Sequence, residues 1–348
     1  MDGITTLIAP DRRNFSELGY LAANPDVAAA VRHGQLKSGH DHFWGIGYTE
    51  SRSMVQYEKI LAARPAKIAR IARHVDWPVT PPFLDNGGLN CLPDSLARMA
   101  GVEPTDAVSQ HDYIDEIKNL ITSEPGRLFL DAGAGFRPTY YANVINLEIV
   151  PYATTDVLAV LEMIPFANDT FDYVISNAVL EHVRDPFTAA REILRVLKPG
   201  GRLYIQVPFL QPYHGYPHHY YNMTKSGLAN LFTDEIDVLS HTVPLYFHPV
   251  WVAQWFFSSW AGGLSDTARA QMERTTVKEL MDFKLQEMDA PFVAELSEDK
   301  QFELASGTYL VGQKRPAHEK PEYQDTSTYA FLSGPMRTAI RNTPCSQA

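Results

Sequence analysis

The sequence predicts an α/β protein built on a doubly wound, largely parallel β-sheet. From Leu128 onward, short apolar segments alternate with stretches of helical spacing, which is the pattern of βαβ units. The first apolar segment runs directly into Asp131-Ala132-Gly133-Ala134-Gly135, a turn of small residues at the edge where such sheets bind ligands. A later helical stretch ends at Lys198-Pro199-Gly200-Gly201, where proline and glycine stop it before the next strand.

The first 55 residues are expected to form a small helical module. Asn24 can cap a helix that Pro25 opens at its first position. Phe43 and Trp44 are expected to dock on the main body of the protein rather than to bind a ligand.

Residues 56–105 are expected to be a linker of helix and loop. Helical spacing covers 53–73, and the prolines and glycines between Trp77 and Asn90 predict a domain border there.

Residues 106–313 are expected to form the sheet domain, followed by a polar tail at 314–348. Helices are expected at 106–122, 185–197 and 225–232, and a helical insertion at about 249–290 precedes the last strand. The order is expected to be βαβ-like throughout. The seven strands are expected at 128–130, 144–149, 156–160, 173–176, 203–207, 236–243 and 302–311.

Composition excludes several classes of protein. Acidic residues outnumber Lys and Arg by 41 to 30, the net charge is -11, and no long basic run could track a nucleic acid. The two cysteines, Cys91 and Cys345, give neither a disulfide framework nor a metal site. The N-terminus does not read as a secretory signal, and the most apolar stretch, 249–263, is too short to span a bilayer. A cytoplasmic protein with no membrane span is therefore expected.

The glycine turn is weak evidence of function when taken alone, because glycines at strand ends also serve only to pack a helix on a sheet. Glu148 follows thirteen residues beyond Gly135, at the end of the second expected strand. An acid at that edge could accept both ribose hydroxyls of a nucleoside, although it could also be a solvent-facing strand end.

Three further motifs follow in order, namely Ile164-Pro165-Phe166, Leu180-Glu181-His182-Val183 and the Lys198 to Gly201 turn. With the glycine turn, they make residues 110 to 313 resemble the class I S-adenosylmethionine-dependent methyltransferases. The resemblance implies a seven-stranded Rossmann-like fold and S-adenosylmethionine as the cofactor. It places six residues at the cofactor: Asp131, Gly133, Gly135, Glu148, Leu161 and Asn177.

The sequence departs from this family at two places. Arg137 and Pro138 stand where a third glycine is usual, and Val160 stands where an aspartate commonly receives the adenine amino group. Adenine recognition is then expected from backbone groups near Leu161, from apolar packing, or from Glu162.

A loop rich in histidine and tyrosine, Tyr213 to Tyr221, follows the fifth strand. His214 and His219 are candidates for a general base, and Tyr220 for a group that orients the acceptor. A structural loop is the main alternative. A metal site is the weaker one, because His214, His218 and His219 have loose spacing and no carboxylate in the same run. We expect no metal, and we expect His182 to brace its helix start.

The insertion contains an aromatic run, namely Trp251, Trp255, Phe256, Phe257 and Trp260. It predicts core packing, a homodimer contact or a wall of the acceptor pocket. Transfer of a methyl group to an oxygen or nitrogen of a small molecule, such as a sugar or secondary metabolite, is the expected function. The alternatives are an inactive nucleotide-binding or scaffolding protein with the same fold and, with less support from the glycine turn, a nicotinamide-dependent dehydrogenase.

Overall fold

A computed structural model describes residues 3–105, 109–215, 218–232, 235–308, 310 and 313. The chain divides into two compact units, Met1–Val207 and Pro208–Asp325. The sequence predicted four segments with borders elsewhere, and the expected polar tail at 314–348 lies outside the described residues.

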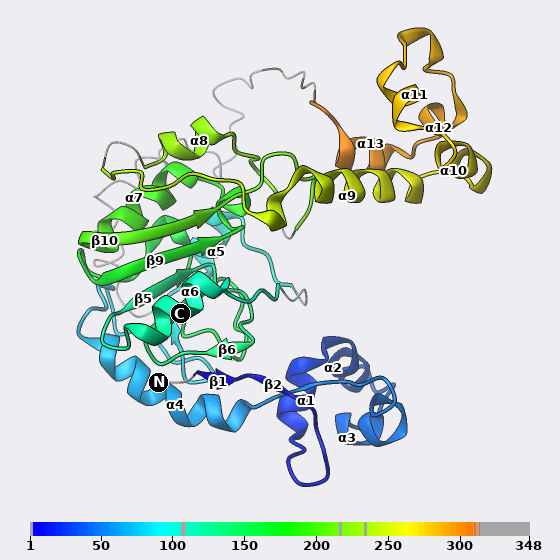
Figure 1. Ribbon diagram of the computed structural model, residues 1–348. Coiled ribbons are helices and arrows are strands. Elements are labelled where there is room, and N and C mark those ends of the chain that lie inside the picture. The colour runs from blue at the N-terminus through cyan, green and yellow to red at the C-terminus, as the bar shows by residue number, and fades with distance from the viewer. Residues whose placement is uncertain are drawn as a thin grey trace. The chain divides into compact units, whose positions relative to one another are not determined.

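The first unit contains a six-stranded parallel sheet with the order β10-β9-β5-β7-β8-β4. Figure 1 shows β10, β9 and β5 side by side. The chain moves outward from β5 in one direction through β7 and β8, and in the other through β9 and β10, so β5 and β9 flank the switch point where such sheets bind ligands. The strands are β4 Leu89–Asn90, β5 Phe129–Ala132, β7 Val144–Glu148, β8 Val157–Leu158, β9 Phe171–Asn177 and β10 Leu197–Gln206.

The strands at the centre of the sheet are apolar because both of its faces are covered. Every residue of β5 and β7 is buried, as expected for a parallel sheet between two layers. On one face, α6 (Asp115–Ser123) packs Ile117 and Ile121 against Phe129. The helix α7 (Pro186–Val196), capped by the Asp185 side chain, buries one face and leads directly into β10. These elements confirm the predicted fold class, the Rossmann-like α/β sheet.

Two crossovers differ from the expected strand–helix–strand pattern. Neither the segment between β5 and β7 nor the segment between β7 and β8 contains a helix. The first of them instead forms β6 (Thr139–Tyr140), which pairs antiparallel with β1 (Ile4–Thr5) at the N-terminus. The expectation of βαβ order throughout is wrong at these two places; at the first, the connection pairs with β1 instead of forming a helix.

The last two expected strands are wrong. Residues 236–243 form no helix or strand. In the expected strand 302–311, the first three residues lie in α13 (Glu298–Leu304), 305–308 and 310 form no strand, and 309 and 311 lie outside the described residues. The sixth strand of the sheet is instead β4, within the segment predicted as a domain border. Two residues paired with the edge of β8 leave no periodic pattern in the sequence. The 56–105 segment also supplies α4 (Tyr57–Ala72) and α5 (Asp94–Ala100) to the same unit.

The N-terminal module is a set of short helices, α1 (Glu17–Ala23), α2 (Pro25–Arg32), α3 (Gly39–His42) and the π-helix η1 (Phe43–Gly47). Pro25 opens α2 as predicted. The Asn24 side chain, however, does not cap it; the amide donates to the carbonyl oxygens of Tyr20 and Ser53. Phe43 is buried in the module's own core with Tyr20, while Trp44 remains partly exposed.

The second unit is mainly helical in its described part. It contains α8 (Lys225–Asn230), α9 (Pro249–Gly262), α10 (Asp266–Met272), α11 (Val277–Met281), α12 (Pro291–Ala294) and α13. Trp260 packs beside a small core around Phe292 and donates its indole N–H to the Phe292 carbonyl, so core packing explains this one aromatic. Trp251 and Phe257 are exposed. Among the described helices, none has the length and apolar character needed to cross a membrane.

Candidate active site

The glycine turn after β5 takes a conformation that requires glycine at two positions. Gly133 has φ 86° and Gly135 has φ 60°, the left-handed region that other residues avoid. A Cβ on Gly133 would lie 2.5 Å from the Val179 methyl carbons, and one on Gly135 would lie 2.6 Å from the Ser109 carbonyl oxygen. The space beside Gly133 is therefore taken by Val179, from the segment after β9, and the turn is packed directly against that segment.

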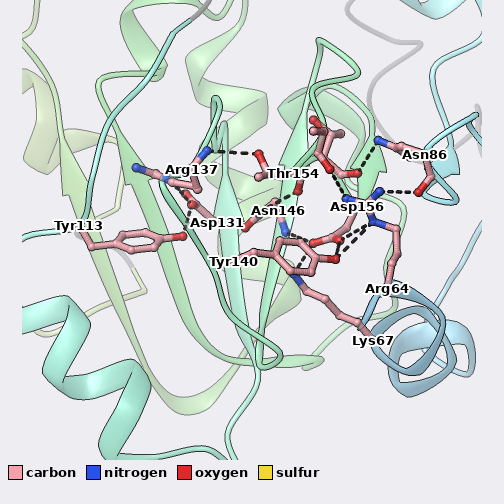
Figure 2. Close-up of polar contacts among 12 residues, drawn as sticks. Arg64, Lys67, Asn86, Tyr113, Asp131, Arg137, Tyr140, Asn146, Thr154 and Asp156 are labelled. Atoms are coloured by element: carbon pink, nitrogen blue, oxygen red, sulfur yellow. Dashed lines mark hydrogen bonds and ion pairs between the residues drawn. The ribbon is translucent and has the colours of Figure 1, made fainter. Parts of the chain in front are cut away.

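The Asp131 carboxylate, at the end of β5, is held by side chains of the protein. Arg137 donates to it twice, from Nε to Oδ2 at 2.7 Å and from Nη2 to Oδ1 at 2.9 Å, and the Tyr113 hydroxyl donates to Oδ2 (Figure 2). The Arg137 guanidinium also lies 4.3 Å from the centre of the Tyr113 ring. Burial raises the pKa of Tyr113 well above its ordinary value. This arrangement explains why an arginine stands where the third glycine is usual.

Glu148 connects the end of β7 to the glycine turn. Its Oε2 accepts from the Gly135 N–H at 2.7 Å, and its Oε1 accepts from the backbone N–H groups of Ile149 and Val150. Burial raises the pKa of Glu148. A carboxylate offers about four acceptor positions, so three backbone contacts leave capacity for a ligand hydroxyl at the same edge.

Asn177 lies at the carboxyl end of β9, opposite Gln206 of β10. The next residue, Ala178, has φ 55°, a strained value for a residue with a Cβ, and donates its N–H to the Gln206 carbonyl at 2.9 Å. Strained backbone persists where the surrounding structure imposes it, and here it turns the chain after β9 toward the glycine turn, where Val179 packs.

Leu161 begins the short helix η2 (Leu161–Met163), just beyond β8, and its side chain is buried. Val160 is also buried, in an apolar cluster with Leu96 and Met163. The Glu162 side chain accepts from the Asp185 N–H at 3.4 Å, at the start of α7, and burial raises its pKa to about 7.

Glu181, in the short helix η3 (Leu180–His182), is a buried carboxyl that the sequence did not predict as a site residue. Its side chain is fully buried, and neither carboxylate oxygen has a hydrogen-bond partner in the part of the chain that the structure describes. His182 Nε2 lies 3.8 Å from Oε1, beyond hydrogen-bond distance. Burial raises the pKa of Glu181 to about 8. The sequence signal was present in the Leu180-Glu181-His182-Val183 motif, but only the structure reveals that the carboxyl is unpaired.

A second buried charged cluster fixes α4 to the sheet. Asp156 receives the Arg64 Nε at 3.3 Å, the Lys67 ammonium at 2.6 Å, the Tyr140 hydroxyl and the Asn146 N–H (Figure 2). Burial lowers the pKa of Lys67 to about 8. Two cations thus share one carboxylate. Periodicity cannot reveal this cluster, because Arg64 and Asp156 are 92 positions apart.

The two candidate histidines of the loop lie together in the second unit, and their contacts define their tautomers. His214 Nδ1 lies 2.8 Å from the Pro212 carbonyl oxygen, which can only accept, so Nδ1 carries the proton and Nε2 is the basic nitrogen. His219 Nδ1 accepts from the His214 backbone N–H at 3.2 Å, so its Nε2 carries the proton, 3.0 Å from Asn222 Oδ1. The basic nitrogen of His219 is therefore already used inside the loop.

Other aromatic contacts complete this loop. The His214 and His219 rings meet edge to face at 4.3 Å, and Trp255 of α9 lies 5.3 Å from His214. Tyr220 packs beside His218 and Tyr221. Because the loop belongs to the second unit, its proximity to the glycine turn stays a prediction.

The residues at the switch point fit an adenosine cofactor with a charged methionine group. The glycine turn brings backbone to the crevice, Glu148 retains acceptor capacity beside it, and Glu181 is an orphaned carboxyl on the neighbouring segment. The protein therefore has a Rossmann-like α/β domain, in which the turn after β5, the acid at the end of β7 and the strained segment after β9 lie at the edge where such domains bind ligands.

Comparison with known proteins narrows this class. Residues 132–205 match the family model described as a methyltransferase domain. An uncharacterized methyltransferase of Mycobacterium leprae is 33% identical over 110 residues, which cover 26% of this chain and 41% of the relative. A ubiquinone/menaquinone biosynthesis C-methyltransferase of Pasteurella multocida is 46% identical over 54 residues, 15% of this chain and 20% of the relative.

The solved structures that resemble the chain include the [4+2]-cyclase SpnF, at 18% identity and a TM-score of 0.28, covering 36% of this chain and 58% of that one. This chain spans less than half the length of the two curated relatives described above. The matched segment is therefore similar to a methyltransferase domain, in agreement with the resemblance to the class I S-adenosylmethionine-dependent methyltransferases that the sequence motifs carry.

Proposed function

We propose that the protein transfers a methyl group from S-adenosylmethionine to an oxygen or nitrogen of a small-molecule acceptor. The observation that carries the proposal is the pairing of the Gly133–Gly135 turn with Glu148 at the switch point of a methyltransferase domain. Glycines with left-handed φ and an acid with spare acceptor capacity are the features that a nucleoside needs at this edge.

The cofactor supplies an electrophilic methyl group on a positively charged sulfur, and the chain's own residues hold it and exclude water. Glu148 would accept a ribose hydroxyl while it stays bonded to Gly135. Backbone groups beside Leu161 and the apolar side chain of Val160 would receive the adenine. Asn177 would hold the methionine part of the cofactor, and Asp131 would act through Arg137 by keeping the turn in shape.

His214 is the general base in this proposal. Its Nδ1 proton is directed to the Pro212 carbonyl, so its Nε2 lone pair can take the proton that leaves the acceptor's hydroxyl or amine group. His219 is a positioning residue, because it accepts from the His214 backbone and is itself held by Asn222. Tyr220 orients the acceptor.

Calorimetry with S-adenosylhomocysteine, and separately with NAD, tests the cofactor assignment. S-adenosylhomocysteine should bind, and NAD should not. Glu148→Ala should weaken binding by about 1.5–3 kcal/mol, the range for a hydrogen bond to a charged group. Binding of NAD alone, or unchanged affinity in Glu148→Ala with an intact fold, would contradict the assignment and favour the dehydrogenase or scaffold alternatives.

The base assignment has a test that needs no known acceptor. Nitrogen NMR of the imidazoles should show the proton on Nδ1 of His214 and on Nε2 of His219. On any hydroxyl or amine acceptor found by screening, His214→Ala should keep cofactor affinity and lose about 10² or more in turnover. His219→Gln should lose less. Normal turnover in both variants would leave the loop a structural element.

A further inference from the structure

Glu181 is a fully buried carboxyl in the first unit, and among the described residues neither of its oxygens has a hydrogen-bond partner. Buried polar groups in native proteins are nearly always bonded, and an unpaired buried acceptor costs about 1–3 kcal/mol, more when it is charged. A second buried acid nearby, Glu162, shows the usual solution, since it accepts the Asp185 N–H. The unpaired oxygens of Glu181 therefore call for a ligand.

The position of Glu181 limits which ligand this can be. It lies two residues beyond Val179, the side chain that packs against Gly133 of the glycine turn. The strained Ala178 begins this segment at the end of β9, which flanks the switch point. The segment that carries Glu181 therefore borders the turn where the methionine part of the cofactor belongs.

The electrostatics favour a cation. Burial raises the pKa of Glu181 to about 8, so the carboxyl holds its proton at neutral pH in the protein without ligand. His182 is a titratable neighbour on the same short helix, with its Nε2 3.8 Å from Oε1, too far to bond the carboxyl. An arriving positive charge favours the ionised carboxylate, and in a buried site this attraction is much stronger than in water.

We propose that Glu181 recognises the positive charge of the methyl donor and so distinguishes S-adenosylmethionine from S-adenosylhomocysteine. The inference rests on the proposed function, because it takes the sulfonium as the cation that arrives at this edge. The sulfur of S-adenosylmethionine is a positively charged sulfonium, whereas the sulfur of the product S-adenosylhomocysteine is a neutral thioether. Glu181 therefore gives up its proton when the donor binds and regains one when the product replaces it.

The discrimination has a consequence for turnover. A site that prefers the charged donor binds the product less tightly, and product release becomes easier. A neutral glutamine of the same shape keeps the packing of η3 and removes the response to charge. The comparison of Glu181→Gln with the native protein therefore isolates electrostatics from shape.

Isothermal titration of both ligands tests the proposal at about pH 7, in buffers with different ionisation enthalpies. The native protein should release about one proton when it binds S-adenosylmethionine and none when it binds S-adenosylhomocysteine. In Glu181→Gln, donor affinity should fall about tenfold or more, product affinity should stay within about twofold, and proton release should disappear.

Glu162→Gln is the matched control, since it removes the carboxyl of another buried glutamate whose pKa is raised by burial. Glu162 is expected near the adenine group, which both ligands carry. Any effect of Glu162→Gln should therefore change the affinities for S-adenosylmethionine and S-adenosylhomocysteine by the same factor. Equal changes for the two ligands in Glu181→Gln, or no proton release from the native protein on donor binding, would overturn the inference. If the native protein binds neither ligand, the proposed function itself fails. Circular dichroism confirms that each variant is folded.

Discussion

Replacement of Arg137 by methionine should destabilise the first unit by about 3–5 kcal/mol, the cost of breaking a buried ion pair by removing one partner. Both Arg137 and Asp131 are almost fully buried, and the two share two hydrogen bonds of 2.7 and 2.9 Å. Arg137→Met keeps much of the aliphatic volume but leaves the carboxylate with only the Tyr113 hydroxyl. The carboxylate is then buried with its charge uncompensated.

Urea unfolding followed by circular dichroism measures this loss, and hydrogen exchange of the β5 amides assigns it to the first unit. Arg127→Met is the control, because Arg127 pairs with Asp172 at the surface with 60% of its side chain exposed, and such exposed pairs contribute little to stability. The double variant Asp131→Leu/Arg137→Met should cost less than Arg137→Met alone. The reasoning would be refuted if the free energy of unfolding of Arg137→Met lay within about 1 kcal/mol of that of the native protein. It would also be refuted if the double variant were less stable than Arg137→Met.

Three further outcomes are expected. Asp156→Asn should lower the free energy of unfolding in urea by about 3–5 kcal/mol, because it leaves two buried cations without an anion. Lys67→Met should cost less, because it removes the surplus cation. Equal losses in the two variants would contradict this account. Gly133→Ala should destabilise the protein by about 1–3 kcal/mol and weaken binding of S-adenosylhomocysteine. Adding Val179→Ala should recover only the part of this loss that comes from the clash with Val179, because φ at position 133 stays positive. Full recovery would rule out backbone strain. The folded protein holds the Glu181 proton up to about pH 8, while the unfolded chain loses it near about pH 4.3. Stability should therefore fall as pH rises through this window, and fall less in Glu181→Gln; parallel pH profiles would contradict the burial of this carboxyl.

The sequence predicted the centre of the sheet well, because buried parallel strands are short apolar runs that stand out against their surroundings. The glycine turn, β7, β9 and the helix before the Lys198 to Gly201 turn all lie where expected. The turn at Lys198 is itself part of β10, with a register shift between Leu197 and Arg202, because the chain continues pairing with β9 across it.

The remaining parts depend on contacts that no local pattern records. The strand β4 has two residues and exists only through pairing with β8. The expected strand that included Phe302 has apolar residues at both strand and helix spacing. Packing of α13 against α9 stabilises the helix there. The role of Glu181 was missed because a motif reveals a residue's type and place but not whether its carboxyl finds a partner.

The pairing of β1 with β6 has a consequence for how the chain folds. Thr6 donates its hydroxyl to the Arg137 carbonyl at 2.7 Å and its N–H to the Pro138 carbonyl at 2.8 Å. The two sides of this contact are separated by 131 positions, so a ribosome must release well over a hundred residues before the first strand can find its place. Contacts of such high sequence separation form slowly. We therefore expect the segment that carries Arg137, which holds Asp131, to take its final shape only after residues 4–6 have paired with it.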